Sequence, residues 1–328
     1  MSRLRSFRKC KQREFFEYVE GFRPIDEDEN LAFGSLWHAG MDAWWGEIAY
    51  ARDEFALESA LDAIRGKARD AFAQVRAEEL LAGYDARWRE ETVRAFDVRS
   101  IEVEFRAGLL NPDTLRTSRT WILGGKVDKC IATRDGNVPG IVEHKTSSDD
   151  VSPGSPYWQK LEMDHQVSNY YVGAETFGFR PEFCLYDVVL KPGQKPLKAT
   201  PPDKRKYKAD GTLYANQREN DETPEEYRGR VREAIEAEPE RFFVRAEIPR
   251  TDAMLKDFLA DVWDEGLAMR QVHRRGRAPR NPDACHAYGT CPFWSACSTK
   301  TDPAEMPERY QRLAWPHPEL TPDEGEPK

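Results

Sequence analysis

Two carboxylates and a lysine near the middle of the chain have the spacing of a catalytic site. Asp128 lies in one predicted strand, and Glu143 and Lys145 lie in the next one. Because side chains two residues apart in a strand project from the same face, Glu143 and Lys145 should point the same way. An Asp-Gly turn at 134–137 would fold the two strands into a hairpin and bring Asp128 beside them.

This arrangement is suited to metal-assisted hydrolysis. Two converging carboxylates offer the hard oxygen ligands that Mg²⁺ or Mn²⁺ prefers. Such an ion activates a water, polarises a phosphodiester and offsets charge on the leaving oxygen. Lys145 would add a positive charge there, and the peptide carbonyl of His144 is a further candidate ligand, with its side chain facing away. The same short pattern is also common on the solvated side of antiparallel sheets.

Neighbouring motifs favour the metal site. Four elements follow one another: Gly34-x-x-x-His38, Gly125-x-x-Asp128, Glu143-x-Lys145 and Gln166-x-x-x-Tyr170. Together they resemble the signature of the RecB-like branch of the PD-(D/E)XK nuclease superfamily. The resemblance implies an α/β fold whose core is a mixed central sheet flanked by helices. It also implies that His38 is a metal ligand and that Gln166 and Tyr170, one helical turn apart, face the active site and the DNA. Glu102 or Glu104 is a candidate for one further acid.

Four of the six cysteines form a second constellation. Cys10 stands alone near the start, whereas Cys285, Cys291 and Cys297 lie together near the end. Four thiolates suit a 4Fe–4S cluster or Zn²⁺, and plain thiols are the third alternative. The arrangement resembles RecB-like nucleases with an iron–sulfur cluster, such as AddB, the CRISPR-associated members and phage versions. In the commonest version two residues separate the first two of the three C-terminal cysteines, whereas here five do.

The remaining two cysteines, Cys130 and Cys184, lie in apolar, strand-like segments and are predicted to be buried core thiols. We expect a cytoplasmic protein, because the N-terminus has no apolar segment of an export signal. In that compartment disulfides are rare. No run approaches the length of apolar sequence that a membrane helix needs, so no membrane partner is expected.

The net charge of −9 argues against a protein that coats nucleic acid, but the basic residues are clustered. The clusters are Arg3–Arg13, Lys204–Lys208 and Arg270–Arg280. Each run taken alone is typical of a solvated face. A metal that joins Cys10 to the C-terminal cysteines would bring the first and third runs together as a DNA-holding surface.

The order of predicted elements indicates one domain over residues 1–301. Its parts are a helical segment at 1–96, a nuclease core at 97–190, an insertion at 191–222 and a C-terminal part with the cysteine cluster at 223–301. Within these, 54–96 reads as one or two helices, with a helix-weakening Gly-Tyr-Asp at 83–85. Residues 302–328 are rich in Pro and Glu and are predicted to form a flexible tail.

The primary hypothesis is a metal-dependent exonuclease that acts on single-stranded DNA or DNA ends in recombination or repair, with a phage or mobile-element origin as one setting. The alternative is a DNA-end-binding partner of a helicase or recombinase in which cleavage is secondary or lost. An electron-transfer protein is a third, and it leaves the carboxylates unexplained. Because the chain has no G-x-x-x-x-G-K-[ST] loop, any unwinding must come from a partner.

Overall fold

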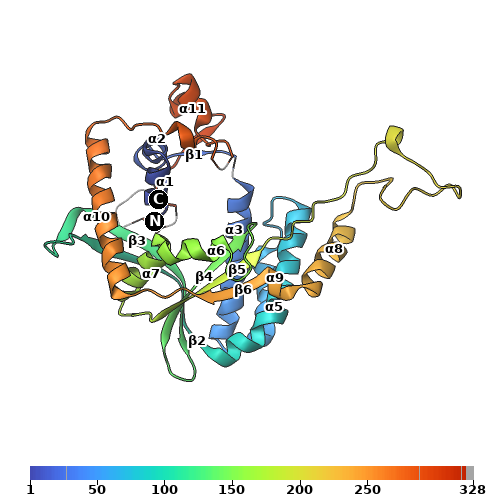
Figure 1. The fold of residues 1–328 in the computed structure, drawn as a ribbon, viewed down its shortest axis with the longest axis horizontal. Coiled ribbons are helices and arrows are strands. Elements are labelled where there is room, and N and C mark those ends of the chain that lie inside the picture. Colours follow the sequence, from blue (N-terminus) through green and yellow to red (C-terminus); the bar gives the residue numbers. More distant parts are fainter. Residues whose placement is uncertain (27, 288, 319, 323–328) are drawn as a thin grey trace.

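A computed structural model describes residues 1–26, 28–287, 289–318 and 320–322. At its centre is a five-stranded mixed sheet in the order β2-β3-β4-β5-β6, in which only β4 and β5 run parallel. The strands are β2 (Phe96–Leu110), β3 (Thr117–Thr133), β4 (Pro139–Ser147), β5 (Phe183–Leu190) and β6 (Phe243–Glu247). Helices cover both faces of the sheet (Figure 1), which confirms the predicted fold class.

The predicted hairpin is the connection between β3 and β4. Its turn is closed by a hydrogen bond from the Asn137 amide to the Thr133 carbonyl (2.8 Å), and Asn137 takes the left-handed conformation that asparagine tolerates (φ 52°). The ladder pairs Lys129 with Val142 and ends there. Asp128 and Glu143 therefore stand one residue beyond the last pair, at the point where the two strands separate.

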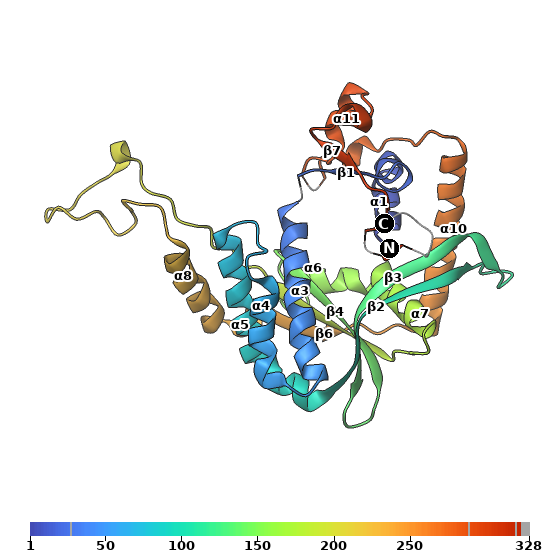
Figure 2. The same cartoon turned by 180° about the vertical axis from the view of Figure 1, so that it is seen from behind.

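One face of the sheet is covered by helices that come early in the chain, α3 (Glu29–Ala49), α4 (Ala56–Ile64) and α5 (Ala71–Ala95), and by α8 (Pro224–Ala237) (Figure 2). Asp28, Asp70 and Thr223 cap three of them with side-chain hydrogen bonds. The long helix α5 continues through Gly83, where a Cβ atom would lie 2.6 Å from Ile235 and 2.8 Å from Phe243. Tertiary packing, rather than a helix end, therefore accounts for this glycine.

The other face is covered by α6 (Pro156–Gln159) and α7 (His165–Glu175), with α10 (Asp252–Arg274) packed beside α7. A 3₁₀ turn (Lys160–Met163) separates α6 from α7. The Asp164 carboxylate accepts hydrogen bonds from the amides of Gln166 and Val167 and so begins α7. A short α9 (Pro239–Phe242) precedes β6.

The two ends of the chain pack together above the sheet (Figure 1). This part contains α1 (Ser2–Lys9), α2 (Lys11–Glu14), a π-helical turn (Phe15–Val19), β1 (Phe22–Pro24), α11 (Trp294–Thr299) and β7 (Tyr310–Arg312). The sequence predicts a flexible tail from residue 302, whereas β7 pairs with β1 and Thr321 hydrogen-bonds to Glu104 on β2. The described part of that segment is thus packed, because its Tyr310 is buried against Phe293.

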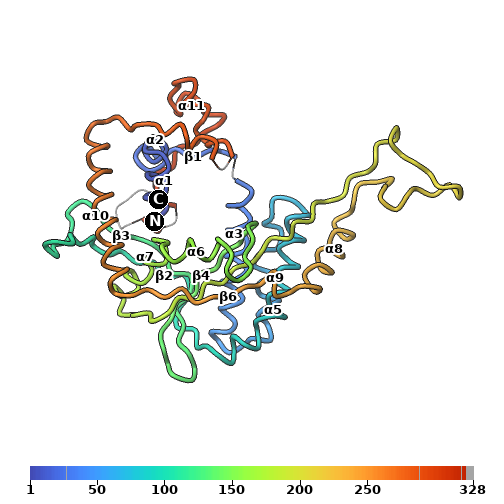
Figure 3. The backbone as a smooth tube through the Cα atoms, in the orientation of Figure 1, coloured from blue at the N-terminus to red at the C-terminus, as the bar shows by residue number. Residues whose placement is uncertain are grey.

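The insertion at 191–222 leaves the body as an extended arm between β5 and α8 (Figure 3). It has little regular structure apart from a helical turn (Pro202–Lys204) and one bridge between Tyr207 and Leu213. The second basic run lies on this arm, away from the sheet. None of the helices in the described ranges has the length and apolar character that crossing a bilayer requires.

Candidate active site

The residues predicted from the motifs meet in one cavity of about 620 Å³. It opens where β3 and β4 separate and is bounded by α3 on one side, α7 on the other, and the start of α1. Its lining includes His38, Asp128, Glu143, Lys145, Gln166 and Tyr170. Four sequence elements up to 132 residues apart, from His38 to Tyr170, are therefore brought together by the sheet and the two helices that pack on it.

Asp128 is buried and held from two sides. The backbone N–H of His144 donates to its Oδ2 (2.9 Å), and His38 Nδ1 lies 3.5 Å from the same oxygen. The side chain of His144 faces away, where its ring packs beside Trp45 and lies 3.6 Å from Asp187 Oδ2. His144 thus contributes its backbone to the site.

Of the two candidate acids on β2, the structure brings Glu102 to the site. Its carboxylate, that of Asp128 and the His38 ring present ligand atoms within 4.8 Å of one another. Glu102 stands opposite Asp128 in the β2–β3 register and has φ 56°, a strained conformation for a residue with a Cβ atom. Glu104 instead accepts hydrogen bonds from Thr321 (2.8–3.1 Å).

Glu143 is fully buried, and its two oxygens differ. Oε1 accepts hydrogen bonds from Lys145 and, at 2.8 Å, from Gln166. Oε2 has no hydrogen-bond partner among the residues that the structure describes. Burial and the nearby Asp128 charge raise the pKa of Glu143 to about 7, although Lys145 opposes them. A buried carboxylate oxygen without a partner is costly unless a proton or a cation is supplied.

His38 and Lys145 have opposite electrostatic settings. Burial lowers the pKa of His38 despite the Asp128 charge, so its imidazole is neutral and able to act as a metal ligand. Burial also lowers the pKa of Lys145, but Glu143 and Asp128 outweigh this effect and raise it, so Lys145 keeps its charge. One turn before His38, Gly34 has no atom within 4 Å of the position of a Cβ, which leaves the cavity open there.

Gln166 and Tyr170 share one face of α7, as the spacing predicts. Gln166 Nε2 donates both to Glu143 and to the Tyr170 hydroxyl (2.6 Å). Burial raises the pKa of Tyr170 well above its ordinary value, so the phenol stays protonated. Gly125 is required for this packing, because a Cβ there would lie 2.8 Å from the Phe105 ring and from Asn169.

Two features of the site have no local signal in the sequence. Arg5 on α1 reaches across to donate to Gln166 Oε1 (3.2 Å) and lies 3.5 Å from Asp164. Lys129 is completely buried and pairs with Asp42 on α3 (2.5 Å), next to the cavity. The first follows from the docking of the N-terminal helix, and the second from the docking of α3 on the sheet.

The four predicted cysteines, Cys10, Cys285, Cys291 and Cys297, line one small cavity of about 40 Å³. The Asn281 amide donates to Cys10 Sγ (3.4 Å). In the described part of the chain, no three of these sulfur atoms lie within 4.8 Å of one another. Burial raises the pKa of Cys291 and Cys297, and nearby arginines oppose it. Cys130 and Cys184 are buried in β3 and β5, away from this cavity.

The first and third basic runs do come together, but they differ in whether their arginines form ion pairs. The Gln12 amide donates to the Pro279 carbonyl (3.2 Å), which joins the two segments. All four arginines of the first run pair with acids, as Arg3–Glu14, Arg5–Asp164, Arg8–Glu265 and Arg13–Glu17. The third run has Arg270, Arg274, Arg275, Arg277 and Arg280 exposed and without an ion pair to any described residue.

A sequence model of the PD-(D/E)XK nuclease superfamily matches residues 1–298. The chain belongs to this superfamily. No curated protein matches it significantly. As a superfamily member the protein is a nuclease, a hydrolase of the kind that uses divalent metal ions. The residues present fit such an ion, because a neutral imidazole, two carboxylates within 4.8 Å of it and the unpartnered Oε2 of Glu143 face one cavity.

Proposed function

We propose that this PD-(D/E)XK nuclease is a Mg²⁺- or Mn²⁺-dependent deoxyribonuclease of the RecB-like branch. The observation that carries the proposal is the convergence of His38, Asp128, Glu143 and Lys145 where β3 and β4 separate. Asp128, Glu143, Glu102, His38 and the peptide carbonyl of His144 would hold the metal. When bound, the metal activates water and offsets charge on the phosphodiester.

The other residues of the site orient these groups. The His144 amide fixes Asp128, and Gln166 fixes Oε1 of Glu143, which leaves Oε2 directed at the cavity. Lys145 stays protonated and places its charge beside the attacking water or the scissile phosphate. Tyr170, held as a neutral phenol, supports Gln166 and lines the cavity toward the DNA.

We propose exonuclease action on single-stranded DNA or DNA ends, in recombination or repair. Met1 and Ser2 of the N-terminal segment border the active-site cavity on the side away from the sheet. A cavity bordered in this way favours a strand end over the middle of a duplex. The exposed arginines at the end of α10 would provide phosphate contacts near this N-terminal segment.

We further propose that Cys10, Cys285, Cys291 and Cys297 hold a 4Fe–4S cluster. A tetrahedral Zn²⁺ with Zn–S bonds of about 2.3 Å needs sulfur atoms about 3.8 Å apart. A four-iron cluster holds its thiolates farther apart, which suits the wider spacing of this cavity. The metal would join residue 10 to residue 297 and so make residues 1–301 one domain.

The test is incubation of anaerobically purified protein with 5′- and 3′-labelled single- and double-stranded DNA, with Mg²⁺, Mn²⁺ or EDTA. Cleavage should require the metal and be lost in Asp128→Ala, Glu143→Ala and Lys145→Ala, while DNA binding persists. Glu182→Ala, at an exposed position next to β5, is the control. Wild-type rates in all three variants would place catalysis elsewhere. Tight end binding by the wild type without cleavage would favour the DNA-end-binding partner of a helicase or recombinase.

A further inference from the structure

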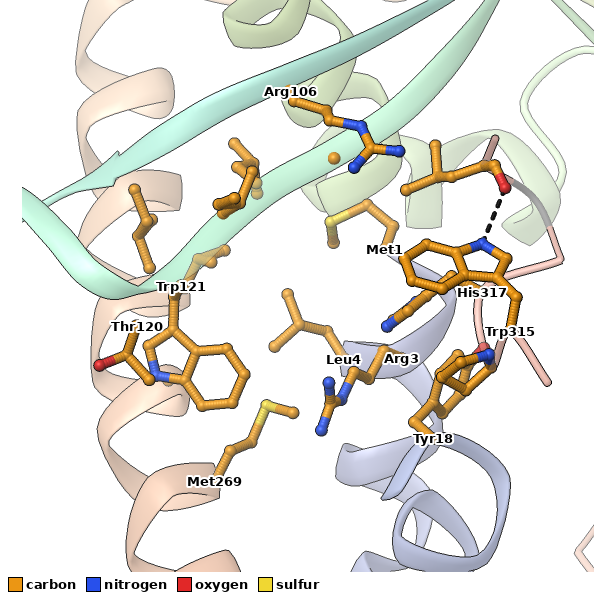
Figure 4. A pocket seen from close by; sticks show the side chains of 18 residues that line it. Met1, Arg3, Leu4, Tyr18, Arg106, Thr120, Trp121, Met269, Trp315 and His317 are labelled. Atoms are coloured by element: carbon orange, nitrogen blue, oxygen red, sulfur yellow. Dashed lines mark hydrogen bonds between the residues drawn. The ribbon is translucent and has the colours of Figure 1, made fainter. Parts of the chain in front are cut away.

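A second cavity of about 450 Å³ adjoins the active site. The two cavities share Met1 and Gly124 in their linings, and Gly124 lies four residues before Asp128 on β3, about 13 Å along the strand. The walls of the second cavity come from α1, the outer halves of β2 and β3, α10, and residues 315–317 and 320 near the C-terminus (Figure 4). The volume lies in the range of about 300–1,000 Å³ that is usual for small-ligand sites.

The chemistry of this cavity differs from that of the chain as a whole. None of the described residues that line it is acidic, although the chain has 58 acids and 49 Lys and Arg residues. Two arginines line it, Arg3 and Arg106. Its aromatic residues are Tyr18, Trp121, Trp315 and His317. Aromatic faces beside cations are the usual means by which proteins hold unpaired bases and their phosphates.

The two tryptophans lie on opposite sides of the cavity, and Arg106 lies above both in the view of Figure 4. Trp121 is half-buried and packs against Gly266 of α10, where a Cβ atom would lie 3.1 Å from the indole. Trp315 is fixed by a hydrogen bond from its Nε1 to the Leu320 carbonyl (2.9 Å) and by the His317 ring at 5.4 Å. Both rings are therefore held in place by their neighbours.

The arginines are also positioned. The Arg3 guanidinium lies 5.4 Å from the centre of the Trp121 ring and is held by Glu14 at 2.7 Å. Arg106 donates to the carbonyl of Thr321. The C-terminal segment thus completes the cavity and orients one of its cations.

We propose that this cavity binds an unpaired nucleotide of the DNA strand whose phosphodiester lies in the active site. The base lies against Trp121 or Trp315, and its phosphate faces Arg106. The inference rests on the proposed function and adds that the substrate needs unpaired nucleotides a short distance from the cut, because a base inside a duplex has both faces covered by its neighbours. Frayed or single-stranded DNA is then preferred over a blunt duplex.

The test uses wild-type protein in EDTA and a thymidine oligonucleotide that carries one 2-aminopurine at successive positions. Because its fluorescence falls on stacking, one or two adjacent positions should be quenched far more than the others. At least one of the variants Trp121→Leu and Trp315→Leu should abolish this positional quench and weaken binding on the order of tenfold. Trp121→Phe keeps a ring and should bind within about threefold of wild type. Tyr50→Leu, at an exposed aromatic at the end of α3, should change neither reading.

An abasic site at the quenched position should weaken wild-type binding by a similar factor and have little further effect in the tryptophan variants. Equal quenching at every position, or unchanged affinity in both leucine variants, overturns the proposal. Cleavage of the same oligonucleotide in Mg²⁺ separates the two hypotheses. Cleavage without a positional quench rejects the nucleotide site and retains the nuclease, whereas a positional quench without cleavage rejects the proposed activity and retains the site.

Discussion

Protonation of Glu143 should control the stability of the metal-free protein. Burial and Asp128 raise the pKa of this carboxyl from 4.5 to about 7. The folded state therefore binds the proton more tightly than the unfolded state does. Loss of this proton destabilises the folded state, and the effect is absent below about pH 4.5 and complete above about pH 7. One pKa step corresponds to about 1.4 kcal/mol, so the buried charge costs about 3 kcal/mol of unfolding free energy at neutral pH.

Glu143→Gln carries a neutral side chain of the same shape at every pH. In EDTA it should match the wild type near pH 4.5 and be more stable by about 3 kcal/mol at pH 8. For a chain of this size the gain corresponds to a melting temperature higher by roughly 5 °C. The measurement is the melting temperature of both proteins at pH 5, 6, 7 and 8, under anaerobic conditions.

Glu182→Gln is the matched control, since this carboxylate is exposed and should shift stability by less than about 0.5 kcal/mol at any pH. Excess Mn²⁺ should remove the advantage of Glu143→Gln, because the cation takes the place of the proton in the wild type alone. A Glu143→Gln gain that is the same at pH 5 and pH 8 would refute the reasoning, since the buried charge would then not be its cause.

His38→Ala should fold normally, bind Mn²⁺ at least about tenfold more weakly by calorimetry, and lose most of its cleavage activity. Unchanged Mn²⁺ affinity would show that His38 is not a metal ligand. Protein purified anaerobically should be brown with about four irons per chain; Cys10→Ser should bleach it and Cys130→Ser should not, whereas colourless protein with one zinc would reject the cluster. Arg245→Met should lower stability by about 3–5 kcal/mol in urea titrations, because buried Asp187 loses its 3.0 Å partner; Asp187→Asn added to it should recover part of the loss.

The carboxylate hairpin could be predicted from the sequence because its determinants are local. Alternating apolar residues define the strands, Asn137 permits the turn, and the two-residue spacing sets Glu143 and Lys145 on one face. Gln166 and Tyr170 follow in the same way from helical spacing. These short-range rules do not depend on how the rest of the chain packs.

Features that depend on long-range packing could not be predicted. The choice of Glu102 over Glu104 reflects its left-handed backbone and the arrival of Thr321 at Glu104, more than 200 residues away. The packed C-terminal segment had the composition of a disordered tail, yet it buries Tyr310 against β1. Likewise, the pairing of Arg5 with Asp164, the residue that caps α7, cannot be read from a run of basic residues.

Arg5 connects the catalytic site to the cysteine lobe, by which we mean the part of the structure that carries Cys10, Cys285, Cys291 and Cys297. It lies on α1 five residues before Cys10 and donates to Gln166, which in turn fixes Glu143. If the metal held by the cysteines keeps α1 in place, Cys10→Ser should lower kcat through the same contact as Arg5→Ala. The double variant should then be no slower than the worse single variant, a coupling of about 0.5–3 kcal/mol.

The assay is kcat for a single-stranded substrate in the wild type, both single variants and the double variant, with the DNA dissociation constant measured in EDTA. Arg65→Ala, at an exposed arginine beyond α4, controls for the loss of a positive charge and should leave both constants unchanged. If the effects of Cys10→Ser and Arg5→Ala on kcat simply multiply in the double variant, the cysteine lobe acts independently of Arg5. In that case the cysteine-bound metal would act through the exposed arginines at the end of α10, which lie outside the catalytic cavity. Cys10→Ser should then alter DNA affinity rather than kcat, because those side chains are proposed to contact phosphate.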